Sequence, residues 1–230
     1  MSTIEPIYQQ DGITLYQGDN REVLPQLEVA DLLLTDPPYG IGQDKGMGSG
    51  GRGGFGNCSH RAPRRYQGDW DATRPDNLSL YLSKAHTAII WGGNHFSDQL
   101  PQCNKWLVWN KEQTMPSYSD CELAWTNLNG NAIKMFTYAG NGFFAREKER
   151  WHPTQKPIAL MNWCLDVAHM EEGWTILDPF LGSGSSLVAA KARGLHGIGI
   201  EREEKYIEIA IKRLSQTTIL QEINLSRYDQ

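Results

Sequence analysis

Residues 174–201 read WTILDPFLGSGSSLVAAKARGLHGIGIE, and this stretch limits the possible folds of the chain more than any other. An apolar run leads into a glycine-rich turn, an alanine-rich helical segment follows, and a second apolar run ends at Glu201. Two strands joined by a crossover helix pair in parallel within one sheet. The sequence therefore predicts a sheet that is largely parallel and has helices packed against it.

The same alternation of short apolar runs and amphipathic segments extends over most of the 230 residues. Three runs at 105–110, 121–127 and 132–139 follow one another closely and are expected to form an antiparallel edge. The pattern predicts one α/β domain over 1–230 with a doubly wound, mostly parallel sheet. The other predicted strands are 12–19, 30–36, 87–93, 174–180 and 196–201, and the predicted helices are 20–27, 74–86, 156–169, 184–194 and 204–214.

Composition disfavours several classes of protein. The four cysteines are scattered without a Cys-x-x-Cys pair, which argues against a zinc site or a disulfide framework and favours a reducing, cytoplasmic setting. The amino terminus lacks the apolar core of a signal peptide, and no window approaches the roughly 18 apolar residues of a membrane span. We therefore expect a soluble protein without a metal. The net charge of −5 means that any contact with nucleic acid must come from local patches.

Two segments interrupt the alternation of strands and helices. Residues 46–56, GMGSGGRGGFG, hold seven glycines and open a long loop, which we place at 41–71. Ordering so many glycines is entropically costly, so this loop is expected to be mobile. The second interruption is a polar segment within 130–156, just before the predicted helix at 156–169.

The glycine-rich turn at 181–185 predicts a nucleoside site. Its glycines let the backbone approach a ligand closely and turn into a helix. Glu201 lies nineteen residues beyond Gly182, at the spacing expected for an acid that accepts hydrogen bonds from ribose hydroxyls. Leu187 stands where a dinucleotide fingerprint has its third glycine, and no Gly-Lys-Ser/Thr follows. These departures argue against NAD and nucleoside triphosphates and leave S-adenosylmethionine.

The stretch LLLTDPPYG, residues 32–40, brings a second set of groups to the carboxyl edge of the sheet, where ligands of open α/β sheets bind. Pro37 and Pro38 stiffen the turn and leave carbonyl groups free to accept hydrogen bonds. Two acceptors, the Asp36 carboxylate and the Pro37 carbonyl, then lie beside the aromatic face of Tyr39. Such a cluster suits a nucleobase amine, whose lone pair is delocalised into the ring unless acceptors hold its hydrogens. A base in a duplex reaches such a pocket only when it is flipped out.

With these motifs, the chain resembles the amino-methylating DNA methyltransferases of the adenine-N6 and cytosine-N4 type. DPPY is similar to their catalytic motif and DPFLGSGS to their S-adenosylmethionine motif. WHPTQKP at 151–157 and LYQGDNREVL at 15–24 are similar to further motifs of the family. The catalytic motif precedes the cofactor motif, as in the permuted class called beta. The resemblance covers nearly the whole chain.

The resemblance implies a Rossmann-like methyltransferase fold and a site-specific enzyme of DNA methylation, often part of a restriction-modification system. It assigns the target amine and base to Asp36, Pro37, Pro38 and Tyr39. The residues that it assigns to S-adenosylmethionine are Asp19 at the adenine, Glu201 at the ribose, Thr154 and Lys156 near the methionine end, and Asp178, Phe180, Gly182 and Gly184 along the turn. Asp178 has an alternative role, in which it only shapes the turn.

The sequence leaves alternatives open for the target base and for the mode of DNA binding. In the family, serine more often replaces the aspartate of DPPY when cytosine is methylated, so Asp36 favours adenine N6. The alternatives are a cytosine-N4 enzyme, a protein-glutamine methyltransferase, for which the motif order is reversed, and a cofactor-binding subunit that needs a partner. Association of two copies as a homodimer is a further alternative. The predicted contacts to DNA phosphates are Arg52, Arg61, Arg64 and Arg65, and a short target-recognition segment is placed at 130–156.

Overall fold

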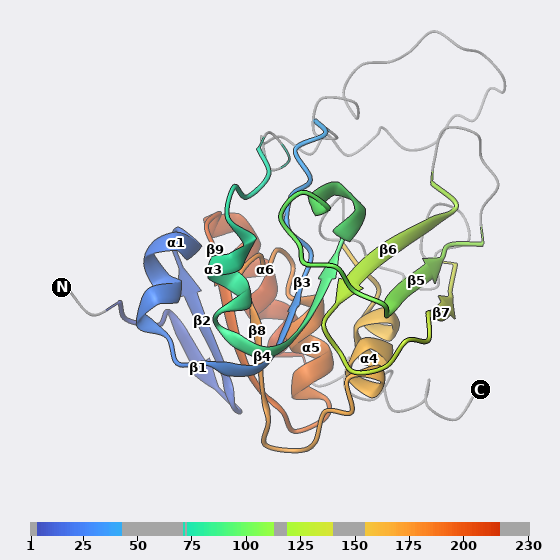
Figure 1. Cartoon of the computed structure of the whole chain (residues 1–230). Coiled ribbons are helices and arrows are strands. Elements are labelled where there is room, and N and C mark those ends of the chain that lie inside the picture. The colour runs from blue at the N-terminus through green and yellow to red at the C-terminus, as the bar shows by residue number, and fades with distance from the viewer. Residues whose placement is uncertain (1–3, 43–70, 72, 113–118, 140–154, 217–230) are drawn as a thin grey trace, which may run out of the picture.

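The computed structural model describes residues 4–42, 71, 73–112, 119–139 and 155–216, and Figure 1 shows their arrangement. Within these residues, nine strands form one sheet in the order β1-β2-β9-β8-β3-β4-β6-β5-β7. The strands are β1 (Tyr8–Gln10), β2 (Ile13–Gln17), β3 (Ala30–Thr35), β4 (Ala85–Trp91), β5 (Trp106–Asn110), β6 (Cys121–Thr126), β7 (Lys134–Thr137), β8 (Thr175–Asp178) and β9 (His196–Glu201).

The centre of the sheet is parallel, as the alternating pattern predicted. Strands β2, β9, β8, β3 and β4 pair in parallel, while β6 runs antiparallel to both β4 and β5. The predicted antiparallel edge is thus present, but its last strand differs, because β7 pairs in parallel with β5. The chain passes from β3 toward β4 on one side and from β8 toward β9 on the other. The boundary between β3 and β8 is therefore a topological switch point, where such sheets bind ligands.

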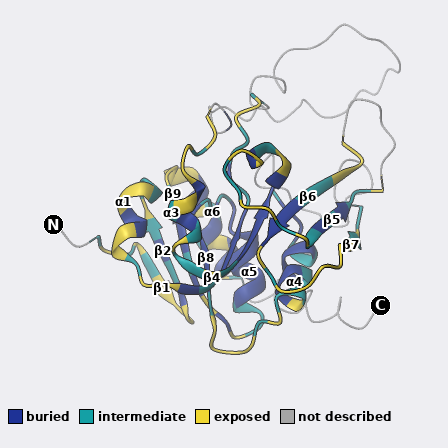
Figure 2. Ribbon diagram, viewed as in Figure 1, coloured by how far each residue is buried: buried dark blue, intermediate teal, exposed yellow. Residues whose placement is uncertain are grey.

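Helices cover both faces of the sheet, which makes the fold doubly wound. One face packs against α4 (Ile158–Val167), α5 (Ser185–Lys191) and α6 (Glu204–Leu214). The other packs against α1 (Asn20–Val23), α3 (Leu78–Leu82) and two 3₁₀ turns, η1 (Leu24–Gln26) and η2 (Gly93–Phe96). The centre of strand β3 is apolar on both faces, because Leu32 and Leu34 belong to the first core and Leu33 to the second. Figure 2 shows the central strands buried.

Three elements differ from their predicted form. The helix predicted at 74–86 is only α3, because Asn77 precedes its first residue and Ala85 already begins β4. The strand β1 was not predicted, since its three residues are half-buried or exposed and carry no apolar pattern. The helix predicted at 20–27 is divided into α1 and the 3₁₀ turn η1, which contains Pro25. No helix in the described ranges is long and apolar enough to cross a membrane.

Candidate active site

The two predicted motifs meet at the switch point between β3 and β8. Thr35, the last residue of β3, donates its hydroxyl to the Asp178 carboxylate at the end of β8, with 2.8 Å between the oxygens. Asp36 directly follows Thr35, and the glycine-rich turn directly follows Asp178. The turn that carries DPPY and the turn that carries GSGS are thereby fixed side by side.

A buried carboxylate outside the predicted motifs holds the DPPY turn. Asp71 Oδ1 accepts the backbone N–H groups of Tyr39 and Gly40 at 2.8 and 2.9 Å. The Asp71 side chain is buried, with only 1% of the residue exposed. Gly92, with φ +67°, lies so close that a Cβ there would be 2.0 Å from the Tyr39 ring. Backbone hydrogen bonds on one side and a glycine on the other therefore fix the position of Tyr39.

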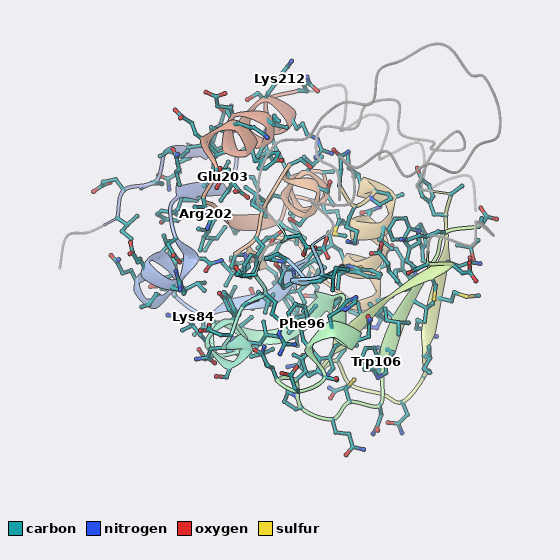
Figure 3. All side chains as sticks on the ribbon, turned by 90° about the horizontal axis from the view of Figure 1, so that it is seen from above. Lys84, Phe96, Trp106, Arg202, Glu203 and Lys212 are labelled. Atoms are coloured by element: carbon teal, nitrogen blue, oxygen red, sulfur yellow. The ribbon has the colours of Figure 1, made fainter. Side chains whose placement is uncertain are left out.

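The Tyr39 side chain connects the catalytic carboxylate with an aromatic cluster. Its hydroxyl donates to Asp36 Oδ1 at 2.5 Å. The ring stacks on His95 of η2, with centroids 4.7 Å apart and planes 17° from parallel, and meets Phe96 edge-on. Figure 3 labels Phe96 on η2, and Arg202 and Glu203 lie away from it in that view. His95, which was not among the predicted site residues, supports the Tyr39 ring.

Lys156 joins the catalytic carboxylate to a charged pair that the sequence did not reveal. Its ammonium forms an ion pair with Asp36 and lies 3.1 Å from Glu122 Oε2 on β6. Glu122 Oε1 is in turn 2.5 Å from the Lys111 ammonium, which lies over the Trp109 ring. The signal for Glu122 was a lone carboxylate within an otherwise apolar strand, CELAWT. This series of ion pairs ends at the Asp36 carboxylate, which the motif predicts to accept a hydrogen bond from the target amine.

Burial and pairing shift the pKa values of these groups in opposite directions. Burial raises the pKa of Asp36 despite its pairing with Lys156, and burial raises the pKa of Tyr39 well above its usual value. Burial would also raise the pKa of Glu122, but Lys156 and Lys111 together hold it at about 2. The pKa of Lys156 is raised, because Asp36 and Glu122 outweigh the effect of its burial. At neutral pH, Lys156 is thus a cation that lies between Asp36 and the Glu122 carboxylate.

The cofactor turn is shaped by glycines and by Glu201. Gly182 and Gly184 have φ values of +53° and +80°, which favour glycine, and open space lies where a Cβ of Gly182 would point. Glu201 Oε2 accepts the Gly182 N–H and Oε1 accepts the Glu203 N–H, both at 2.8 Å. Burial raises the pKa of Glu201. Glu201 therefore holds the turn at Gly182 through this hydrogen bond.

The absent third glycine has a structural explanation. The Leu187 side chain in α5 packs directly over β9, where a Cβ at Gly197 or Gly199 would lie 2.8 Å from a Leu187 methyl carbon. Gly197 and Gly199 in β9 thus allow the helix and the strand to pack closely. A glycine at position 187 of the helix is not needed for this packing.

Asp178 and Arg213 hold the glycine-rich turn in place through hydrogen bonds. Both Asp178 oxygens are engaged within the protein, because they accept from Thr35, from Ser186 and from the backbone N–H of Phe180. Burial raises the pKa of Asp178 to about 6. The buried Arg213 guanidinium donates to the Ser183 carbonyl. These contacts favour the alternative in which Asp178 shapes the turn.

Asp19 follows the carboxyl end of β2, and Phe180 follows the carboxyl end of β8. The Gly18 N–H donates to the Glu201 carbonyl at 3.0 Å, which places Asp19 near the end of β9. Asp19 caps α1 and pairs with the Arg21 guanidinium, which lowers the pKa of Asp19. Phe180 lies against Tyr81, with ring centroids 5.2 Å apart. Both residues are thus at the predicted edge.

Several predicted functional residues lie outside the described residues: Thr154 and the four arginines Arg52, Arg61, Arg64 and Arg65. The same holds for most of the 41–71 loop and for 140–154 of the recognition segment. Strand β7 lies within the described part of that segment. Among the described residues, no group of three or more His, Cys, Asp and Glu side chains could hold a metal ion.

Comparison with known proteins supports the predicted family resemblance. The family model N6_N4_Mtase, described as DNA methylase, matches residues 105–212, from β5 through the cofactor turn to α6. The type II methyltransferase M2.DpnII of Streptococcus pneumoniae is 26% identical over 91% of this chain and 92% of its own length. These matches support the predicted resemblance to the amino-methylating DNA methyltransferases. In this chain DPPY comes before the cofactor motif.

Further relatives and solved structures agree with this assignment. The type II methyltransferase M2.MboI of Moraxella bovis is 23% identical over 94% of this chain and 93% of its own length. The crystal structure of the M1.HpyAVI–SAM complex has a TM-score of 0.57 and 22% identity, over 89% of this chain and 100% of that one. The cytosine-N4-specific PvuII DNA methyltransferase has a TM-score of 0.58 at 14% identity, over 96% and 93%. At these identities, the structures support the predicted fold.

Proposed function

We propose that this methyltransferase transfers a methyl group from S-adenosylmethionine to the N6 amine of a flipped adenine in DNA. The observation that carries the proposal is the position of Asp36 and Tyr39, hydrogen-bonded to each other at the switch point and next to the Gly182 turn. The Asp in DPPY favours adenine over cytosine, since family members that act on cytosine more often have Ser there.

The described residues fit S-adenosylmethionine. Gly182 leaves open space at the turn, and the Glu201 carboxylate lies beside it at the end of β9. A carboxylate that already accepts two backbone N–H groups has further lone pairs for ribose hydroxyls. Asp19 at the end of β2 and Phe180 beside it would flank the adenine. When bound, S-adenosylmethionine supplies a methyl group activated by a positively charged sulfur.

The groups of the protein activate and hold the target amine. The Asp36 carboxylate and the Pro37 carbonyl accept the two amine hydrogens, which localises the nitrogen lone pair. Tyr39 offers an aromatic surface for the base, and Asp71 and Gly92 keep that surface in place. Prepositioned acceptors of this kind lower the barrier because they need no reorganisation during the reaction.

The product identifies the base. We expect N6-methyladenine when the purified chain is incubated with DNA and S-adenosylmethionine, and nucleoside mass spectrometry of the digested DNA measures it. N4-methylcytosine as the sole product would contradict the adenine assignment and leave the amine chemistry intact. If the chain binds S-adenosylmethionine but methylates DNA only after a cell extract is added, the partner-dependent alternative is correct.

The arginines of the 41–71 loop are proposed to contact DNA phosphates. They are among the few concentrated positive charges of an acidic chain, and they follow the catalytic turn in sequence. Each phosphate contact adds about 0.9 to the slope of log affinity against log salt concentration. Replacing Arg61, Arg64 and Arg65 by alanine should flatten this slope by roughly 1–3 units.

Binding titrations at several salt concentrations measure the slope. Lys84→Ala is a suitable control, because Lys84 precedes β4 at the opposite edge of the sheet and is labelled in Figure 3. An unchanged slope for the triple variant would assign phosphate binding to the 130–156 segment instead. Affinity for S-adenosylmethionine should stay the same in all variants.

A further inference from the structure

The Asp36 carboxylate has no oxygen without a protein donor in this structure. Oδ1 accepts the Tyr39 hydroxyl, and Oδ2 is paired with the Lys156 ammonium. A target amine that donates to Asp36 must share an oxygen with one of these donors. Of these two donors, Lys156 has an alternative acceptor, because its ammonium is already 3.1 Å from Glu122 Oε2.

The charges of the cluster balance only when Glu122 is included. Lys111 and Lys156 are cations, and Asp36 and Glu122 are anions, in one continuous chain of ion pairs. The Lys156 and Lys111 side chains are only 7% and 9% exposed, so solvent screens them weakly. Without Glu122, the group next to the target amine would carry one excess positive charge.

That excess charge would oppose the proposed reaction. As the amine nitrogen bonds to the methyl carbon, the carbon–sulfur bond breaks and sulfur keeps its electron pair. The nitrogen then carries a positive charge until it releases one of its protons to water. A nearby ammonium without a compensating carboxylate raises the energy of this developing cation. A carboxylate that pairs with the ammonium removes this cost.

We propose that Glu122 is a positioning residue for Asp36. Glu122 holds the Lys156 ammonium when the target amine replaces this ammonium on Asp36, and it compensates the ammonium charge during methyl transfer. Lys111 keeps Glu122 ionised and directed toward Lys156. This role rests on the proposed function. The other titratable groups near Asp36 are Tyr39, whose hydroxyl stays neutral because burial raises its pKa, and the carboxyl groups of Asp178 and Asp71. Among the described residues, none of these three forms an ion pair with Glu122.

Glu122→Gln tests the role, because it keeps the shape of the side chain and removes its charge. We expect single-turnover methylation to slow roughly 10- to 100-fold, with KM for DNA and the affinity for S-adenosylmethionine within about threefold of wild type. Glu122→Asp should recover part of the rate. Glu112→Gln, the same change at an exposed position after β5, should behave as wild type.

The pH profile separates this role from a structural one. The acid limb of kcat/KM reports the ionisation of Asp36 in the free enzyme. Glu122 raises the pKa of Asp36 through charge repulsion. Removing that charge lowers the pKa of Asp36, so the acid limb should move to lower pH in Glu122→Gln. A slower variant with an unmoved acid limb and no recovery in Glu122→Asp would overturn the proposal.

The remaining outcomes are equally decisive. If Glu122→Gln does not fold, Lys111→Met decides, since it should slow methylation severalfold with the protein intact, and an unchanged rate overturns the proposal. An active wild type with an equally active, folded Glu122→Gln overturns this role alone. A wild-type chain that methylates no DNA amine, with or without cell extract, overturns the proposed function and this role together.

Discussion

Replacing Asp36 by alanine is expected to lower the rate of methyl transfer by roughly 100-fold or more, while affinity for S-adenosylmethionine stays within a few-fold of wild type. The substitution removes the acceptor that the amine needs, together with the partner of the Tyr39 hydroxyl. Lys156 keeps Glu122 as a partner, so the cluster does not retain an unpaired ammonium. The cofactor turn is held by other residues, Asp178 and Arg213.

Single-turnover kinetics and titration calorimetry measure the two effects separately. Asp98→Ala is a matched control, since it removes an exposed carboxylate whose partner is Arg74 rather than Lys156. The control should leave both rate and affinity unchanged. A loss of cofactor affinity in Asp36→Ala as large as that in Glu201→Ala would refute the division between catalytic and cofactor residues.

Glu201→Ala is expected to show the reverse pattern, with cofactor affinity reduced about 10- to 100-fold. Hydrogen bonds to a charged group contribute about 1.5–3 kcal/mol, and about 1.4 kcal/mol corresponds to a factor of ten in affinity. Part of the loss comes from the turn itself, because the Gly182 N–H and the Glu203 N–H lose their acceptor. The methylation rate at saturating cofactor should fall much less.

Calorimetry again gives the affinity, and a thermal melt without cofactor shows how much the turn contributes to stability. Glu203→Ala is the control, since Glu203 follows Glu201 by two positions and its exposed carboxylate pairs with Arg202. Equal losses of affinity in both variants would indicate a general effect of negative charge. The assignment of Glu201 to the ribose would then be wrong.

The strength of each local signal explains how much of the fold the sequence predicted. The bounds of β9 and α6 agree with the predicted ranges, because glycine and charged residues end both apolar patterns sharply. The helix before β4 was predicted too long, since nothing in its composition marks the change from helix to strand at Ser83 and Lys84. The parallel pairing of β7 depends on which strand it meets in space, and periodicity does not carry that information.

The site was predictable where its residues are consecutive in sequence. Asp36, Tyr39, Gly182 and Glu201 lie in short motifs at strand ends, so topology alone brings them to one edge. Glu122 and Asp71 are isolated in sequence and reach the site only through tertiary contacts. A lone carboxylate in an apolar strand was the one signal available for Glu122, and its partner Lys156 was assigned to the cofactor.

The hydrogen bond between Thr35 and Asp178 spans 143 positions of the chain, and this separation affects how the enzyme folds. Closing so long a loop costs entropy before the contact it permits is gained. Proteins dominated by such distant pairings reach the native state slowly. Neither half of the chain contains both motifs, so an early, partly folded species has no complete catalytic centre. Methylation should therefore reappear during refolding only with the final docking of β3 against β8, and not with the first helices.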